Sequence, residues 1–163
     1  NQALLAASNA PSHKHTHPWK FYILGKATRT KLIPTISRLA AIKSAKQNSQ
    51  NLEADCSRAI NKIIQPPLLI AVTSKKTEED SFREKEDYAA TVCALHNMVL
   101  SLWENGVGSQ WSTGSITRDE ETYDILSIDS KTEEIIGFVK AGYPEKTREV
   151  RKKPVVDIVD YLD

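Results

Sequence analysis

The chain has few cysteines, almost no net charge and no long hydrophobic run. Its two cysteines, Cys56 and Cys93, cannot form a disulfide framework, and we expect both to be buried free thiols. Lys and Arg number 22 against 21 Asp and Glu, so the net charge of +1 lacks the basic excess that nucleic-acid binding requires. The longest apolar run, residues 68–72, is far shorter than the roughly 20 residues of a membrane-spanning helix. We therefore expect a globular cytoplasmic protein that has neither a membrane nor nucleic acid as its partner.

Glycine-dependent motifs are also scarce. The six glycines form neither a Gly-x-Gly-x-x-Gly turn nor a Walker loop, which excludes two common phosphate cradles. No Gly-x-Ser-x-Gly elbow is present, and neither cysteine has the neighbours of a catalytic thiol, so a nucleophilic enzyme is poorly supported. The basic positions Arg148, Arg151, Lys152 and Lys153 could contact a phosphate, although such a run is usually a solvated surface.

The apolar spacing predicts a single domain over residues 1–163. Strands are expected where β-branched and aromatic residues cluster, at 19–24, 68–73 and 134–142. Helices are expected from amphipathic spacing and from capping residues, at 1–9, 28–43, 52–63, 83–105 and 117–126. Thr28 or Thr30 would cap the second helix, and a capping box beginning at Thr117 would open the last. Residues 74–81 are expected to be exposed, and 107–115 to form a connection. This order is typical of an α/β or α+β fold around a small sheet.

The second half of the longest predicted helix, residues 88–103, is apolar on nearly every side. A surface helix normally shows a polar face, so this helix either lies at the centre of the fold or is covered by a second subunit. We expect a homodimer that buries it, with an interface above about 2,000 Å². Gly106 supplies the left-handed stop after it.

Three histidines alternate in the segment before the first strand. On an extended chain His13, His15 and His17 would point to one side, where three imidazoles could hold Zn²⁺ or Cu²⁺. Pro18 and the absence of a carboxylate in the segment argue against such a centre. A solvated loop and a polar loop that contacts a ligand are the other interpretations.

Three segments resemble signature segments of the nitroreductase superfamily. Residues 10–21, Ala-Pro-Ser-His-Lys-His-Thr-His-Pro-Trp-Lys-Phe, are similar to the family's loop that leads into an aromatic strand. Residues 106–114, Gly-Val-Gly-Ser-Gln-Trp-Ser-Thr-Gly, resemble the segment after its long central helix. Residues 137–144, Gly-Phe-Val-Lys-Ala-Gly-Tyr-Pro, resemble its last core strand and turn. The three occur in the family's order, and the resemblance runs from Leu4 to Tyr161.

The resemblance implies an α+β fold of three layers, with a mixed or antiparallel central sheet flanked by helices around a long apolar central helix. It also implies that FMN binds at a homodimer interface and that NAD(P)H is oxidised, with nitroaromatics, quinones or related small molecules as electron acceptors. The alternative is a degenerate member that keeps the fold and binds flavin, or serves a structural role, without turnover.

Carried over by position, the resemblance implies contacts with both nucleotides. Flavin contacts are implied for Ser12, His13 and His15. Two positions of this loop differ from the family's usual residues: His15 stands where many relatives have Asn, and His17 where most have Gln. Asn9 matches a position that holds arginine near the cofactor in the compact branch. The segment against the flavin comprises Trp111, Ser112 and Thr113. The end of the long helix matches a segment that the family uses to bind the nicotinamide nucleotide. This segment comprises Ser101, Leu102, Trp103, Glu104, Asn105 and Gly106.

One feature of the family is not found in this sequence. The family's chains open with a helix that carries Arg-Arg-Ser-x-Arg, whose guanidinium groups hold the FMN phosphate. Because this sequence begins after that point, we expect a fragment, compensation by Arg151 and Lys152, or weaker flavin binding. No catalytic side chain and no metal are expected, since the flavin carries the chemistry.

Overall fold

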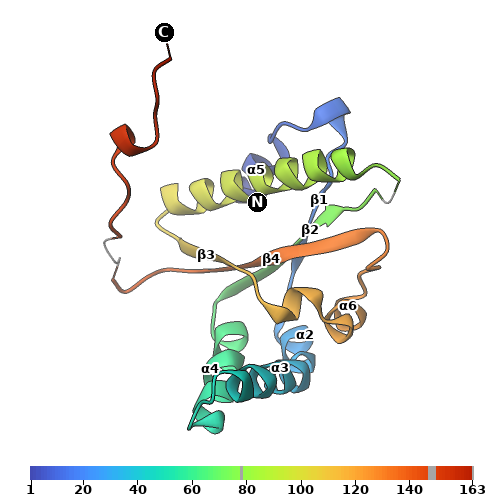
Figure 1. The fold of residues 1–163 in the computed structure, drawn as a ribbon, viewed down its shortest axis with the longest axis vertical. Helices are drawn as coiled ribbons and strands as arrows, with labels where there is room; N and C mark the ends of the chain where they lie inside the picture. The colour runs from blue at the N-terminus through green and yellow to red at the C-terminus, as the bar shows by residue number, and fades with distance from the viewer. Residues whose placement is uncertain (78, 147–149, 163) are drawn as a thin grey trace.

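Four strands form an antiparallel sheet in the middle of the molecule (Figure 1). The structure is a computed structural model that describes residues 1–77, 79–146 and 150–162. The sheet order is β1-β2-β4-β3, and the strands are β1 Trp19–Ile23, β2 Leu68–Lys75, β3 Gly108–Ser112 and β4 Glu133–Gly142. The two central strands are buried on both faces, which explains why their sequences are continuous apolar runs and not alternating ones.

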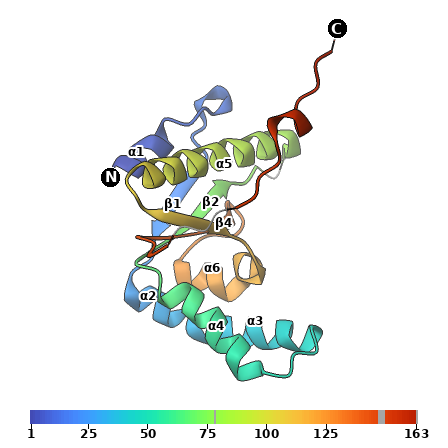
Figure 2. The ribbon, with the colours of Figure 1, turned by 90° about the vertical axis from the view of Figure 1, so that its left-hand side faces the viewer.

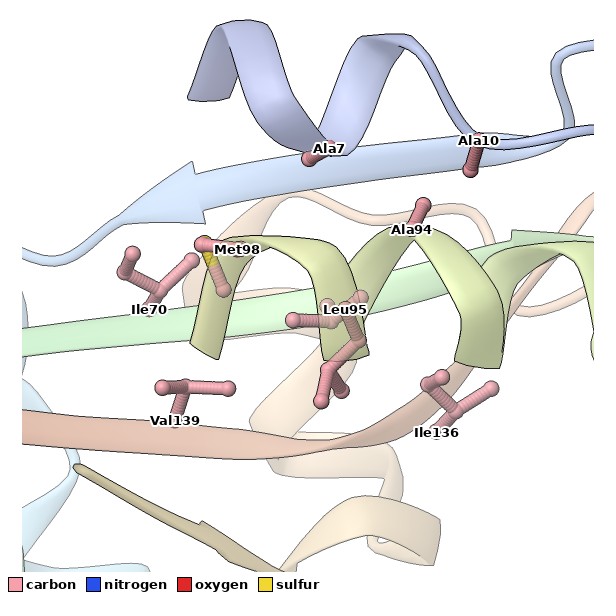
Figure 3. Close-up of a cluster of buried hydrophobic side chains, with 9 residues drawn as sticks. Ala7, Ala10, Ile70, Ala94, Leu95, Met98, Ile136 and Val139 are labelled. Atoms are coloured by element: carbon pink, nitrogen blue, oxygen red, sulfur yellow. The ribbon is translucent and has the colours of Figure 1, made fainter. Parts of the chain in front are cut away.

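One face of the sheet is covered by the longest helix, α5, Ser81–Glu104, against which α1, Gln2–Ser8, packs (Figures 1 and 2). Figure 3 shows the core between these layers, which consists of Ala7, Ala10, Ile70, Val72, Ala94, Leu95, Met98, Ile136 and Val139. Ala7 and Ala94 have small side chains, and small side chains at a helix contact allow a short distance between the axes. α1 therefore lies close against α5.

The other face is covered by four shorter helices, α2 Lys26–Lys31, α3 Ile33–Lys46, α4 Leu52–Ile64 and α6 Glu120–Leu126 (Figure 2). A second core cluster lies there, made of Leu24, Leu32, Ile36, Ile63, Leu69, Ala71, Ile128, Ile135 and Phe138. Three short 3-10 turns complete the elements, η1 His13–His15, η2 Ser115–Arg118 and η3 Val155–Asp157. The predicted three-layer α+β class is thus confirmed, although α5 covers one face of the sheet and does not lie at its centre. None of the helices in the described part of the chain is long and apolar enough to cross a membrane.

The predicted helix over 28–43 is two helices. α2 ends at Lys31 and α3 begins at Ile33, with Pro34 in its first turn. Proline has no amide hydrogen and its ring clashes with the preceding turn, so it fits at the start of a helix and breaks a longer one. Gly25 precedes α2 as its cap, and the expectation that Thr28 or Thr30 caps the helix was wrong.

Three further segments differ from the prediction. Thr117 lies in η2, where its hydroxyl donates to the Gly114 carbonyl at 3.0 Å, and α6 begins after Asp119. The Asp119 carboxylate accepts from Arg38 of α3 at 2.8 Å, which explains why it does not cap α6. Residues 108–112 of the expected connection form strand β3, and Ser74 is buried at the end of β2 and not exposed.

The outer side of α5 is more exposed than predicted. Cys93 is exposed and Cys56 is half-buried, so the expectation of two buried thiols was wrong. Leu100 and Trp103 are 52% and 60% exposed, because the helix turns Ala94, Leu95 and Met98 inward, toward the core that it shares with α1 and the sheet (Figure 3). The apolar character all round the helix is therefore not explained by burial within one chain.

A half-buried carboxylate connects three strands. Glu133 at the start of β4 accepts from Thr73 Oγ1 at 2.5 Å, from Tyr22 Oη at 2.9 Å and from Lys20 Nζ at 3.0 Å. Burial raises the pKa of Glu133, but the hydrogen bonds from these three side chains outweigh burial, and the pKa lies below its ordinary value of 4.5. Glu133 therefore stabilises the fold above about pH 4.5, and this contribution is lost as the pH falls through the lowered pKa.

We expect Glu133→Gln to reduce the free energy of unfolding by about 1–2 kcal/mol at pH 7, because a charged acceptor for three donors is lost. Urea unfolding between pH 7 and pH 3 should show a shallower acid decline than in the unmutated chain. Glu134→Gln is the matched control, since Glu134 is the adjacent and exposed carboxylate. The same acid decline in Glu133→Gln and the unmutated chain would contradict this assignment.

Candidate functional site

A pocket of about 490 Å³ lies between the α3–α4 pair and the strands β3 and β4. Its apolar wall includes Ile36, Leu39, Ile63 and Phe138. Its polar wall includes Ser112, Thr113 and Gly114, which come at and just after the end of β3. A pocket with an extended apolar wall and a few polar groups is typical of a small-molecule site.

The sheet and the following turn position this polar wall. Ser112 pairs with Phe138 in the β3–β4 ladder, and its hydroxyl donates to the Phe138 carbonyl at 3.3 Å. The Gly114 carbonyl accepts from the Thr117 amide at 3.1 Å. A side chain at Gly114 would meet no atom within 4 Å of its Cβ, so this position is open space at the edge of the pocket.

Trp111 packs against the sheet and does not line the pocket. The register of β2 and β4 passes from Val72↔Gly137 to Thr73↔Ile135, which leaves Ile136 without a partner in a β-bulge. The Trp111 indole donates to the Ile136 carbonyl at 3.2 Å. A Cβ at Gly137 would lie only 2.1 Å from the indole nitrogen, so the absence of a side chain there makes room for the ring. The ring thereby fixes the strand that leads to Ser112.

Basic side chains give the pocket its charge. Lys43, Arg58, Lys62 and Lys140 line it, and Asp55 is the single carboxylate among its lining residues in the described chain. Asp55 bonds to Arg58 and accepts from the Ser44 hydroxyl at 2.8 Å. Burial lowers the pKa of Lys140, and the nearby charge of Lys62 lowers it further. The pocket therefore carries excess positive charge, which favours an anionic ligand.

The histidine loop, residues 12–17, lies on the opposite side of the sheet, where η1 packs on α5. His13 Nδ1 is 3.9 Å from a Glu86 carboxylate oxygen, and the His17 ring meets Trp19 edge-on at 5.4 Å between centroids. The segment is not extended, and no group of three or more His, Cys, Asp or Glu side chains in the described residues is arranged to hold a metal ion. The geometry does not support the interpretation of this loop as a metal centre.

The predicted site residues thus fall in three places within one chain. Ser112 and Thr113 lie at the pocket. Asn9, Ser12, His13 and His15 lie on the α5 side of the sheet. Residues 101–106 form the end of α5, beside a second hollow of about 320 Å³ that Leu100, Trp103 and Pro144 line. Contact of any of these residues with a cofactor stays a prediction.

Comparison with known proteins decides the family. The model of the Nitroreductase family matches residues 1–143. The chain belongs to the nitroreductase family. YfhC of Bacillus subtilis (strain 168), provisionally named an NAD(P)H nitroreductase, is 29% identical over 156 residues, which are 94% of this chain and 77% of YfhC. YdjA of Escherichia coli (strain K12), named in the same way, is 23% identical over 87% of this chain and 74% of its own.

Solved structures share the fold of this nitroreductase-family chain. A nitroreductase-like family protein from Bacillus cereus superposes with a TM-score of 0.76 at 23% identity, over 99% of this chain and 82% of its own. An iodotyrosine deiodinase solved with FMN and 3-iodo-L-tyrosine gives 0.72 at 21% identity, over 99% and 85%. A nitroreductase-named protein of Desulfovibrio desulfuricans in complex with FMN gives 0.70 at 18% identity, over 96% and 79%.

The basic residues of the pocket were missed by sequence reasoning. Lys140 is the single charge in the strand segment 135–142, and that interruption of a buried apolar run was a usable signal. Lys62 follows Asn61 in the amphipathic helix α4, where a lysine usually belongs to the solvated face. The basic positions that were singled out lie elsewhere: Arg151, Lys152 and Lys153 are exposed after the last strand, and Arg148 lies outside the described residues.

Proposed function

We propose that this chain is an FMN-dependent oxidoreductase that oxidises NAD(P)H and reduces nitroaromatics, quinones or related small acceptors. The observation that carries the proposal is the pocket in which the Ser112–Thr113–Gly114 segment faces apolar and basic side chains. Solved relatives of the same fold that bind FMN support it.

The residues of the pocket fit a flavin nucleotide. Ile36, Leu39 and Phe138 offer an apolar wall for a planar ring, and Gly114 leaves open the space that a Cβ would occupy. The ammonium groups of Lys62 and Lys140 have no ion-pair partner among the described residues, so a phosphate or another anionic part of the ligand would neutralise them.

The protein's part in the reaction is binding, orientation and exclusion of water. When bound, FMN supplies the transfer of hydride between NAD(P)H and the acceptor. The Ser112 hydroxyl already donates to a carbonyl, so its oxygen presents an acceptor, while the Thr113 hydroxyl can accept or donate. Lys140 lies in the strand ladder, where the backbone holds its position firmly. The apolar wall keeps water from the ring face.

A second copy of the chain is part of the proposal, because one chain separates the loop of Ser12, His13 and His15 from the pocket. The exposed side of α5 supports a partner surface: Phe82, Ala89, Cys93, His96, Leu100 and Trp103 recur at spacings of three, four or seven and are exposed. Beyond the three layers, a tail extends with large exposed apolar side chains (Figures 1 and 2), namely Val155, Val156, Ile158, Val159, Tyr161 and Leu162. We propose that a homodimer covers both surfaces and brings the loop of one copy to the pocket of the other.

The nicotinamide nucleotide is proposed to approach the end of α5 at residues 101–106. The hollow that Leu100, Trp103 and Pro144 line lies beside this segment, and Lys146 adds a positive charge to its rim. These features would suit the ring and the phosphates of NAD(P)H.

Titration with FMN, followed by turnover, tests the proposal. We expect the purified chain to quench FMN fluorescence and, once loaded, to oxidise NADH or NADPH with a nitroaromatic or a quinone under exclusion of oxygen. Flavin binding without oxidation of either nucleotide would favour the degenerate module instead. No binding at micromolar FMN would contradict the proposed oxidoreductase and the flavin-binding module, and would favour a purely structural role.

We expect Gly114→Val to weaken FMN affinity about tenfold or more, with little change in melting temperature. The added side chain meets no atom of the protein at its Cβ, and the backbone there is extended, so the fold accepts it while the ligand loses space. Thr30→Val is the control, because the Thr30 side chain is exposed and lies outside the pocket. Equal losses of melting temperature and affinity in Gly114→Val would favour a packing role alone.

A further inference from the structure

The loop between α1 and β1 has an unusual backbone. Three of its residues that are not glycine adopt left-handed conformations, with φ of 52° at Lys14, 53° at His15 and 44° at His17. Side chains with a Cβ disfavour this region, and such conformations persist only where the surroundings hold them. Something outside these residues must therefore fix the loop.

The bonds within the loop are long. The His17 amide donates to Ser12 Oγ at 3.2 Å, and the Thr16 amide donates to the His13 carbonyl at 3.3 Å. Most of the side chains of residues 12–17 are exposed, so little packing adds to these bonds. The internal bonds alone do not explain the strained backbone.

One short bond connects the loop to the body of the protein. Thr16 Oγ1 donates to Asp87 Oδ1 of α5 at 2.6 Å, across 71 positions of the sequence. Among the described residues it is the single side-chain hydrogen bond from residues 12–17 to another element. His13 faces Glu86, the neighbour of Asp87, at the longer distance of 3.9 Å.

The Asp87 carboxylate is buried, and burial of a charged group away from water costs free energy. Its residue is 1% exposed, and its nearest cation is Arg83, whose Nε lies 3.6 Å from the other carboxylate oxygen and makes no hydrogen bond in the described structure. A buried carboxylate with an incomplete set of partners contributes little to stability. Its short bond to Thr16 gives it a local role instead.

We propose that Asp87 is a positioning residue that, through Thr16, holds the 12–17 loop in the conformation that presents Ser12, His13 and His15 to the flavin. This inference rests on the proposed function for its ligand, but the holding of the loop is a property of the protein alone. Neither Thr16 nor Asp87 lines the pocket, so both would affect the ligand only through the loop that their hydrogen bond holds.

Thr16→Val and Thr16→Ser separate the hydroxyl from the shape of the side chain. Valine keeps the shape and removes the donor, whereas serine keeps the donor. Thr30→Val is the control, because the Thr30 hydroxyl is exposed and bonds within α2 to the Lys26 carbonyl. Two measurements are made on the full chain: amide hydrogen exchange of residues 12–17, and the FMN dissociation constant from fluorescence quenching.

In Thr16→Val we expect exchange of residues 12–17 to be about tenfold faster or more while the amides of β2 and β4 keep their rates, and FMN affinity to fall about tenfold. Thr16→Ser and Thr30→Val should behave as the unmutated chain does. Unchanged loop exchange in Thr16→Val overturns the inference, and so does faster exchange with unchanged FMN affinity. If the unmutated chain binds no FMN, the proposed function fails and the flavin part of the inference fails with it, while loop exchange alone decides whether Asp87 holds the loop.

Discussion

Gly137→Ala is expected to lower the free energy of unfolding by about 1–3 kcal/mol, although alanine normally stabilises a strand relative to glycine. Two causes act together. The backbone at Gly137 has a φ of 158°, which residues with a Cβ rarely adopt, and the added Cβ would lie 2.1 Å from the Trp111 indole nitrogen and 3.0 Å from the Ser112 carbonyl oxygen. The ring would have to leave the Ile136 carbonyl, whose hydrogen bond it makes at the bulge. For a domain of this size the change corresponds to a melting temperature lower by roughly 3–10 °C.

A double-mutant cycle identifies the cause. In a Trp111→Ala background the ring is absent, so Gly137→Ala should be less destabilising, with a coupling energy of about 1–2 kcal/mol from urea unfolding. The remaining loss measures the strain of alanine at the positive φ of position 137. Gly114→Ala is the control for alanine introduced into open space, and we expect it to leave stability nearly unchanged. Additive effects of the Gly137 and Trp111 changes would contradict the close contact.

Local patterns predicted most of the elements. The apolar run at 68–72 indicated a strand covered on both faces, and amphipathic spacing indicated the helix that begins after Asn51. These features depend on residues near one another in the sequence. The contact of Trp111 with Gly137 and the bond of Thr16 to Asp87 join residues 26 and 71 positions apart, and no local pattern carries that information.

Only part of the candidate site was predicted from the sequence. The resemblance located Ser112 and Thr113, which do line the pocket, because their position after β3 belongs to a recognisable segment. It did not locate Lys62, since a single lysine in an amphipathic helix usually belongs to the solvated face. It also did not locate Lys140, although the interruption of a buried apolar run by one charge was a usable signal. It also placed the histidine loop with the pocket, whereas one chain holds the two on opposite faces of the sheet. The proposed second copy resolves that separation.

The partner surface gives the second large expected effect. We expect the unmutated chain to be a dimer at micromolar concentration, and Leu100→Glu to weaken dimerisation at least about a hundredfold, because a carboxylate would be buried in an apolar interface. Leu100 is 52% exposed within one chain, so the change should barely affect the fold of the monomer. Leu52→Glu is the matched control: Leu52 is 50% exposed and lies at the start of α4.

Dimerisation and flavin binding should then fail together. Leu100 lines the hollow at the end of α5 and not the main pocket, so in a site contained within one chain Leu100→Glu would leave FMN affinity intact. If the loop of Ser12, His13 and His15 comes from the partner, Leu100→Glu should be monomeric by light scattering and should also lose FMN. Leu52→Glu should remain a dimer and should retain FMN. An unmutated chain of 18.2 kDa in solution that nevertheless binds FMN tightly would contradict the shared site and place all flavin contacts on one chain.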